Sequence, residues 1–145
     1  MARVKLTMPQ QMIAEIQVPV RITDINYGNH LGNGAIVDIL HEARMQWLYG
    51  HGFTELDVAG CGLIMADLAV EFKAEGFYGD TVSVKLGCSD ISRVGFDLYY
   101  ALWVTRDEQT ILLAQAKTGM VCFDYSQKKV TPVTDVLLKM LQPQP

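Results

Sequence analysis

The sequence predicts an α+β fold in which an antiparallel β-sheet wraps around one long α-helix. Three observations lead to this fold class. Apolar residues recur at helical spacing over one long segment, residues 33–50. Segments that alternate between apolar and polar residues flank it, and those after it are joined by short polar turns, which favour antiparallel pairing. A helix with an apolar stripe must bury it, and one face of the sheet is the only large apolar surface available.

The predicted long helix has a defined stripe, start and end. The stripe consists of Ile36, Ile39, Leu40, Ala43 and Trp47. Asn33 is expected to cap the N-terminus and Gly50 to end the helix. Because both belong to this apolar stripe, we expect Leu40 and Trp47 to lie on the buried side of the helix.

Five strands are predicted around this helix. Residues 12–23 alternate loosely and form the first strand, and residues 24–34, rich in Asp, Asn and Gly, form a loop. The strands after the helix are residues 61–73, 80–89, 94–105 and 110–125, with a tight turn over residues 106–109. Pro132 and Thr134 introduce a short helix that ends near Leu141.

Length and charge narrow the classes of function. The 145 residues suit one domain spanning residues 1–145, and 50% of them are hydrophobic. The net charge of −4 argues against a nucleic-acid partner, which requires a basic surface. No signal peptide is recognisable and no segment is apolar for long enough to cross a bilayer, so no membrane partner is expected.

The three cysteines indicate a compartment. Cys61, Cys88 and Cys122 form no C-x-x-C pair, and an odd number cannot form a closed set of disulfides. They lie in or beside apolar strand segments and are expected to be small buried side chains. A chain of this kind fits a reducing compartment, the cytoplasm.

Two motifs for metals and cofactors are incomplete. His41 and Glu42 begin an H-E-x-x-H pattern, but Met45 occupies the position of the second histidine, so no zinc site is expected. The glycines of the loop do not match G-x-G-x-x-G. The sequence therefore predicts neither a metal nor a cofactor.

The loop and the helix that follows it carry a family resemblance. Residues 21–33 read RITDINYGNHLGN, and residues 41–44 read HEAR. This resembles the 4-hydroxybenzoyl-CoA thioesterase branch of the hotdog superfamily, whose members carry a D-x-D-x-x-G-H-V-N-N loop and then E-x-A-R in the central helix. Residues 70–73 (VEFK) and 78–80 (YGD) resemble further family motifs, and the resemblance covers residues 18–141.

The resemblance implies a hotdog fold and hydrolysis of an acyl-CoA or acyl-carrier-protein thioester to a free acid and the thiol. It also implies a homodimer or homotetramer in which protomers pair edge to edge, with the pantetheine arm between them. The thioester is expected near the N-terminus of the long helix. Unpaired N–H groups there can stabilise an oxyanion.

The sequence departs from the family pattern at the acid. The second acid of D-x-D, the usual catalytic aspartate, is Asn26, and an amide cannot accept a proton at neutral pH. The G-H and N-N pairs are Asn29-His30 and Gly32-Asn33. Two hypotheses follow: a thioesterase in which a neighbour of Asn26 takes the proton, or a module that binds CoA esters without hydrolysing them.

Each candidate residue has a functional and a structural interpretation. Asp24 is a general base or orients His30, or it makes an Asx turn. His30 transfers protons near neutral pH, or it fixes the loop by hydrogen bonds. Asn26 holds the water or the thioester. The N–H of Asn33 or Gly34 is the expected oxyanion donor, and the Asn33 side chain can also cap the helix.

Charged side chains give a second set of candidates. Lys73, Arg93 and Lys117 either bind the CoA phosphates or are solvated surface charges. Glu42 is either a catalytic carboxylate on the helix or the partner of Arg44 or of a neighbouring strand.

Overall fold

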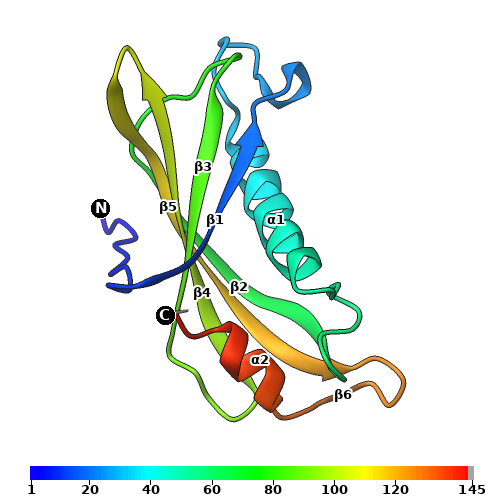
Figure 1. The fold of residues 1–145 in the computed structure, drawn as a ribbon. Helices are drawn as coiled ribbons and strands as arrows, with labels where there is room; N and C mark the ends of the chain where they lie inside the picture. Colours follow the sequence, from blue (N-terminus) through cyan, green and yellow to red (C-terminus); the bar gives the residue numbers. More distant parts are fainter. Residues whose placement is uncertain (144–145) are drawn as a thin grey trace.

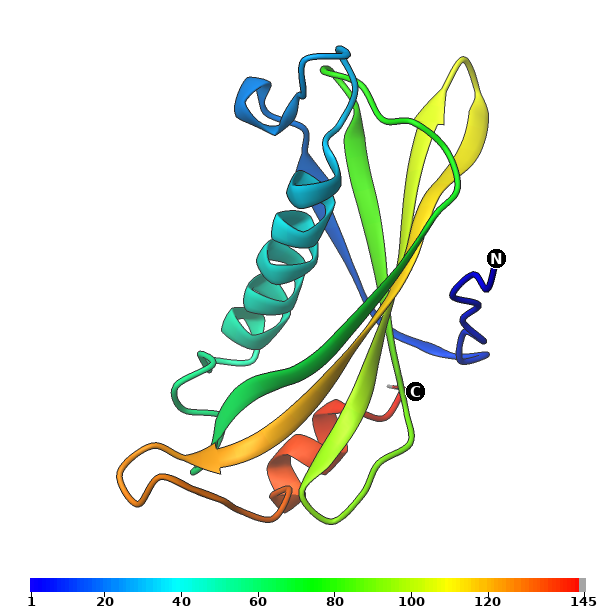
Figure 2. The same cartoon turned by 180° about the vertical axis from the view of Figure 1, so that it is seen from behind.

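The long helix α1 lies along one face of a single twisted sheet (Figures 1 and 2). The structure, a computed structural model, describes residues 1–143. Helix α1 spans Asn33–Gly50, as predicted, and it buries the predicted apolar stripe against the sheet. Leu40 and Trp47 are 1% and 3% exposed, which confirms their predicted burial.

The start of α1 differs from the prediction in one detail. The N-cap is Gly32, and no side chain caps the helix. Asn33 is the first helical residue, so the prediction that its side chain caps the helix is wrong. Because a glycine N-cap has no side chain to accept hydrogen bonds, the first N–H groups of the helix stay uncovered.

The sheet has six antiparallel strands. They are β1 Met12–Pro19, β2 Gly62–Phe72, β3 Thr81–Ser89, β4 Gly95–Arg106, β5 Gln109–Asp124 and β6 Lys129–Val130. Their order is β1-β3-β4-β5-β2, and the short β6 pairs with β5. The four long strands after α1 are confirmed, but β6 was not predicted because two residues show no alternation.

The first strand ends earlier than predicted. Strand β1 stops at Pro19, and the 3₁₀ turn η1, Ile22–Asp24, follows it. Proline has no N–H for a ladder hydrogen bond. The Asp24 carboxylate also accepts a hydrogen bond from the Arg21 N–H at 2.8 Å, which favours the turn. The predicted strand over residues 12–23 therefore extended too far.

Two tight local features agree with the sequence. Asp107 and Glu108 join β4 to β5 with φ of 49° and 65°, the positive values of a type I′ hairpin turn. Helix α2, Asp135–Met140, begins after Thr134, whose hydroxyl accepts a hydrogen bond from the Leu137 N–H. It lies at the end of the sheet away from the N-terminus of α1 (Figure 1).

The cysteines are all free thiols. Cys61 and Cys122 are buried and Cys88 is half-buried, in line with their prediction as small side chains of the interior. Burial raises the pKa of Cys88 and that of Cys122 to about 12. Within residues 1–143, no helix combines the length and the apolar character needed to cross a lipid bilayer.

Candidate active site

The loop between β1 and α1 folds back on itself and ends at the N-terminus of α1. The Asn26 N–H donates to the His30 carbonyl oxygen at 2.8 Å, which closes the loop. The Leu31 N–H donates to the Gly76 carbonyl oxygen at 2.8 Å and ties the loop to the segment after β2. A Cβ at Gly76 would lie 2.9 Å from the Leu31 side chain, so this approach requires glycine.

The Asn26 side chain organises the loop. Its Oδ1 accepts hydrogen bonds from the N–H groups of Gly28 at 2.9 Å and His30 at 3.2 Å. Because both partners are donors, they fix which end of the amide is oxygen. The amide nitrogen has no hydrogen-bond partner among residues 1–143 and is free to donate to a ligand.

His30 is held by two side chains from the segment after β2. Its Nε2 lies 3.1 Å from Glu75 Oε2, and its ring meets the Phe77 ring edge-on at 5.3 Å. With Nε2 turned to the carboxylate, Nδ1 is the nitrogen that can accept a proton from a ligand or water.

The first turn of α1 supplies backbone donors next to these side chains. The Ile36 N–H bonds the Gly32 carbonyl, and the N–H groups of Asn33, Gly34 and Ala35 have no partner among the described residues. Apart from the neighbouring residues and the backbone of the helix itself, no atom lies within 4 Å of a Cβ built at Gly34, so this turn is open. Three unpaired N–H groups at the positive end of a helix are suited to stabilise a developing negative charge.

These groups surround one hollow of about 320 Å³, which we call the N-terminal hollow. Its lining includes Asn26, His30, Asn33, Phe72, Lys73 and Glu75. The structure therefore brings together an amide donor, an imidazole and the helix N–H groups, three of the elements predicted from the loop.

Asp24 does not join this set. Its carboxylate is buried and is bound by Arg21, with Nη2 at 3.2 Å from Oδ1. It lines a different groove of about 430 Å³ between β1 and α1, together with Asp38 and Glu42. The partner that orients His30 is thus Glu75 and not Asp24, and Asp24 instead shapes the 3₁₀ turn.

Lys73 lines the N-terminal hollow. Its Nζ lies 3.0 Å from Glu71 Oε2, and the Leu6 N–H donates to the other oxygen of that carboxylate. These two contacts, the backbone one first, lower the pKa of Glu71. Lys73 is thereby held at the rim of the hollow.

Arg93 lies far from this hollow. It is exposed in the turn between β3 and β4, and its carbonyl accepts the Val133 N–H at 2.8 Å. This turn lies beside α2, at the opposite end of the sheet from the N-terminus of α1 (Figure 1). Within one chain, the predicted grouping of Arg93 with Lys73 does not occur.

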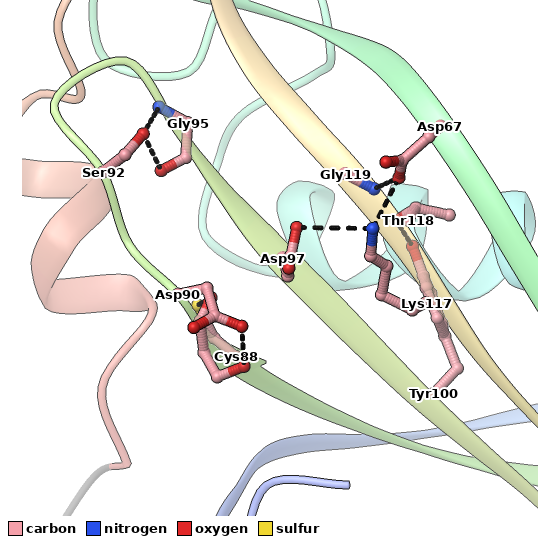
Figure 3. Close-up of polar contacts among 11 residues, drawn as sticks. Asp67, Cys88, Asp90, Ser92, Gly95, Asp97, Tyr100, Lys117, Thr118 and Gly119 are labelled. Carbon is pink, nitrogen blue, oxygen red and sulfur yellow. Dashed lines mark hydrogen bonds and ion pairs between the residues drawn. The ribbon is translucent and has the colours of Figure 1, made fainter. Parts of the chain in front are cut away.

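Lys117 faces the side of the sheet away from α1. Figure 3 shows its Nζ between Asp67, at 2.8 Å, and Asp97, at 3.7 Å. The hydrogen bond between Lys117 and Asp67 raises the pKa of the lysine and lowers that of Asp67, while burial raises the pKa of Asp97. Lys117 therefore forms ion pairs with two carboxylates on the surface of the sheet.

Glu42, an acidic residue on α1, does not pair with Arg44. Glu42 is exposed and accepts a hydrogen bond from Gln46 at 2.6 Å. Arg44 instead turns into the interior and faces Glu55, in the loop after α1. No local pattern in the sequence indicated Glu55 or Glu75, because the fold brings each to its partner from outside the motif that contains that partner.

No metal-binding group is recognisable in the part of the chain that the structure describes, since no three His, Cys, Asp or Glu side chains cluster there.

The sheet wraps one long helix, and the open N-terminus of that helix lies beside a polar loop. These two features together define a hotdog-fold protein of the thioesterase type. The model of the family described as the Thioesterase-like superfamily matches residues 20–141, so the chain belongs to that superfamily. This confirms the resemblance and the fold class predicted from the sequence.

Solved structures share this fold. The PA2801 protein from Pseudomonas aeruginosa is 22% identical, with a TM-score of 0.81 over 91% of this chain and 100% of that chain. Slr0204, a 1,4-dihydroxy-2-naphthoyl-CoA thioesterase from Synechocystis, is 19% identical, with a TM-score of 0.73 over 88% of this chain and 93% of that chain. A mutant 4-hydroxybenzoyl-CoA thioesterase complexed with 4-hydroxybenzoyl-CoA is 14% identical, with a TM-score of 0.77 over 89% and 98%. A search of curated proteins finds no match.

Proposed function

We propose that this protein is an acyl-CoA thioesterase, which hydrolyses a thioester to a free acid and CoA. The observation that carries the proposal is the meeting of His30, the Asn26 amide nitrogen and the unpaired N–H groups of α1 at one hollow. Two of the solved structures above are named as thioesterases for CoA esters of hydroxylated aromatic acids, which supports a CoA ester as the substrate.

In the proposed reaction the donors stabilise the oxyanion and His30 carries the proton. The thioester carbonyl oxygen accepts hydrogen bonds from the Asn26 amide and from the N–H of Asn33 or Gly34, which stabilise the negative charge that develops on it. His30 takes a proton from water as the water oxygen bonds to the carbonyl carbon. When the C–S bond breaks, His30 returns this proton to the sulfur of the leaving thiol.

We assign two further roles as part of the proposal. Lys73, at the rim of the hollow, binds a phosphate or a polar group of the pantetheine arm. Arg93 takes part only if a second protomer brings it across an interface. We expect a homodimer or homotetramer, and the three free thiols are the basis for expecting the reducing cytoplasm.

The test is hydrolysis of a panel of short, long, aromatic and hydroxylated acyl-CoAs, followed with a thiol-reactive dye. The protein's own thiols should give little background, since burial raises the pKa of Cys88 and Cys122 to about 12 and thiolates are the reactive form. Absence of turnover on all four classes would exclude the proposal. An acyl-carrier-protein ester tested in parallel shows whether the thiol of the substrate belongs to CoA or to an acyl carrier protein.

A second function is favoured by one observation. Asn26 stands where relatives carry an acid, and it uses its oxygen to bind the loop backbone. The alternative is a module that binds CoA esters without hydrolysing them. Calorimetry with acyl-CoA separates the two, because tight binding without release of free CoA supports the module.

A further inference from the structure

The segment before β1 lies on the face of the sheet that points away from α1 (Figures 1 and 2). Two contacts fix its path. The Pro9 ring packs on Gly87 of β3, where an added Cβ would lie 2.7 Å from the ring. The Leu6 N–H donates to the carboxylate of Glu71 on β2. Because β4 and β5 lie between β3 and β2, residues 5–9, which we call the strap, cross both of these strands.

Side chains that face outward beneath the strap are buried. Tyr99 of β4 pairs with Gly87 on one side and with Lys117 on the other, so it lies on the outer face of the sheet. Tyr99 is nevertheless only 8% exposed, and Ala101, two residues further along β4, is 4% exposed. An outer sheet face that is open to water would leave such positions accessible. The strap is therefore packed on the sheet and is not a solvated tail.

Glu71 joins the strap to the rim of the N-terminal hollow. One oxygen of its carboxylate accepts from the Leu6 N–H, and the other lies 3.0 Å from Lys73 Nζ. The Leu6 N–H, then Lys73 and then the charge of Lys5 hold the pKa of Glu71 below its usual range, so this carboxylate stays ionised. Because β2 is an edge strand, its outer face and the hollow on its inner side meet at that edge.

The strap changes the charge at this rim. Lys73 and Glu71 alone would cancel, which leaves little attraction for an anion. Lys5 precedes the residue whose N–H holds Glu71, and it brings a second positive charge near the same carboxylate. Lys73 uses one of the three donors of its ammonium group on Glu71, which leaves two for a ligand. The excess positive charge and these donors suit a phosphate group.

The lysine pair is set apart from the reacting centre. Glu75 holds His30, and Glu71, which holds Lys73, precedes it by 75 − 71 = 4 residues. Four residues span at most about 14 Å. In CoA the pantetheine arm separates the thioester from the phosphates, so a phosphate site must lie away from His30 by a length of this order. The position of the lysine pair meets that requirement.

We propose that Lys5 of the strap and Lys73 together bind a phosphate group of the CoA moiety, with Glu71 holding both at the rim of the N-terminal hollow. The inference rests on the proposed function, since it assigns the CoA half of the same substrate. Glu71 is a positioning residue. It restricts the long Lys73 side chain before the substrate arrives, which reduces the entropy lost on binding. The strap is thereby part of substrate recognition.

The test breaks the contact between the strap and Glu71 in the full chain. Leu6→Pro deletes the N–H that binds Glu71, and Lys73→Met deletes one of the two phosphate ligands. We expect either variant to raise KM for an acyl-CoA by about three- to tenfold while kcat stays within about twofold. The double variant should show little further increase, because both changes break one linked unit. Leu6→Ala keeps the N–H and should lie closer to the unmodified protein than Leu6→Pro does.

Truncated esters identify the group that is bound. With the same acyl group on pantetheine, which carries no phosphate, neither variant should change KM. An ester of dephospho-CoA distinguishes the two sources of phosphate. If the variants still raise its KM, the diphosphate is bound, and if they do not, the 3′-phosphate is bound; both results support the inference. Lys129→Met, at an exposed lysine of β6, is the charge control and should leave every KM unchanged.

The outcomes separate this inference from the proposed function. Hydrolysis of acyl-CoA with KM unchanged in both variants overturns the inference and leaves the thioesterase proposal intact, and so does an equal rise in KM for the pantetheine ester. If no ester is hydrolysed, calorimetry with CoA itself decides: weaker binding by Leu6→Pro supports the inference, and equal or undetectable binding overturns it. If Leu6→Pro does not fold, as judged by its thermal unfolding, Lys5→Met carries the test with the same outcomes.

Discussion

The Nε2 of His30 lies 3.1 Å from the carboxylate of Glu75. His30 precedes α1 in the sequence, whereas Glu75 comes after it. Both side chains are partly exposed, at 37% and 65%, so the pair adds little to stability. Its consequence is orientation: the carboxylate holds Nε2 and leaves Nδ1 as the nitrogen that can accept a proton.

Loss of the imidazole should be the most damaging single change at the site. His30→Ala is expected to lower kcat by about 10³-fold, within the usual range for a positioned base. Glu75→Gln should lower it less, because the amide can still contact the ring while the charge is lost. Steady-state rates on the best acyl-CoA measure both effects, and Lys117→Met serves as the control. A fully active His30→Ala together with an inactive Asp24→Ala would make Asp24 the base.

Asn26 should act as a donor and as the brace of its loop. Asn26→Ala frees the N–H groups of Gly28 and His30 and removes one donor to the oxyanion, so we expect a loss of roughly 10²-fold in kcat. Asn26→Asp keeps the two backbone hydrogen bonds but replaces the free amide nitrogen with a charged oxygen. If His30 is the base, this change should leave the rate equal or lower.

A rise in the rate of Asn26→Asp has a clear meaning. The variant introduces the second acid of the D-x-D family pattern at this position. Increased hydrolysis would indicate that the native protein is a binding module or a slow enzyme that lacks its base. Measuring acyl-CoA affinity by calorimetry alongside the rate shows whether the variant changed chemistry or binding.

Arg106 should position His30 from the β4–β5 hairpin. Its Nη2 donates to the Glu75 carbonyl at 2.7 Å, its Nε bonds Asp80 at 3.1 Å, and its guanidinium lies over the Phe77 ring at 4.8 Å. Arg106→Ala removes all three contacts from the segment that holds His30. We expect kcat to fall by roughly tenfold. The buried Asp80 carboxylate also loses its charged partner, so the free energy of unfolding should fall as well, and urea melts measure it alongside the rate. Arg106→Lys should restore part of the rate, because it keeps the charge over the ring.

The sequence allowed the elements to be predicted better than the site. The bounds of α1 were predicted from its apolar period, from Asn33 at its start and from Gly50 at its end, and the later strands from alternation, all of which are local signals. Strand β1 was extended too far because the contact between Asp24 and Arg21 competes with the sheet. Glu75 was not predicted as a site residue because its role depends on the Leu31–Gly76 contact, which only the tertiary fold creates.

Trp47 should contribute strongly to stability. Its side chain is 3% exposed in the core between α1 and the sheet. Trp47→Ala should cost about 3–5 kcal/mol of the free energy of unfolding, measured by urea melts. Trp47→Phe is the matched variant: the indole Nε1 has no hydrogen-bond partner, so a smaller aromatic ring loses packing but no hydrogen bond. A cost below about 1 kcal/mol for Trp47→Ala would contradict the observed burial.

The final prediction concerns assembly through β2. This strand is at one edge of the sheet and pairs only with β5 among the described strands. Three of its apolar side chains are substantially exposed: Met65 at 46%, Leu68 at 38% and Phe72 at 53%. An edge strand with exposed apolar residues favours pairing with another chain, so we expect a homodimer at least, seen by light scattering at micromolar concentration.

Met65→Lys should shift the equilibrium between dimer and monomer toward monomer, because a charge at this edge opposes pairing. Ile91→Lys is the matched control, since Ile91 is 43% exposed in the turn between β3 and β4. A 16.2 kDa species for the unmodified protein would refute the predicted dimer and would count against any site shared between protomers.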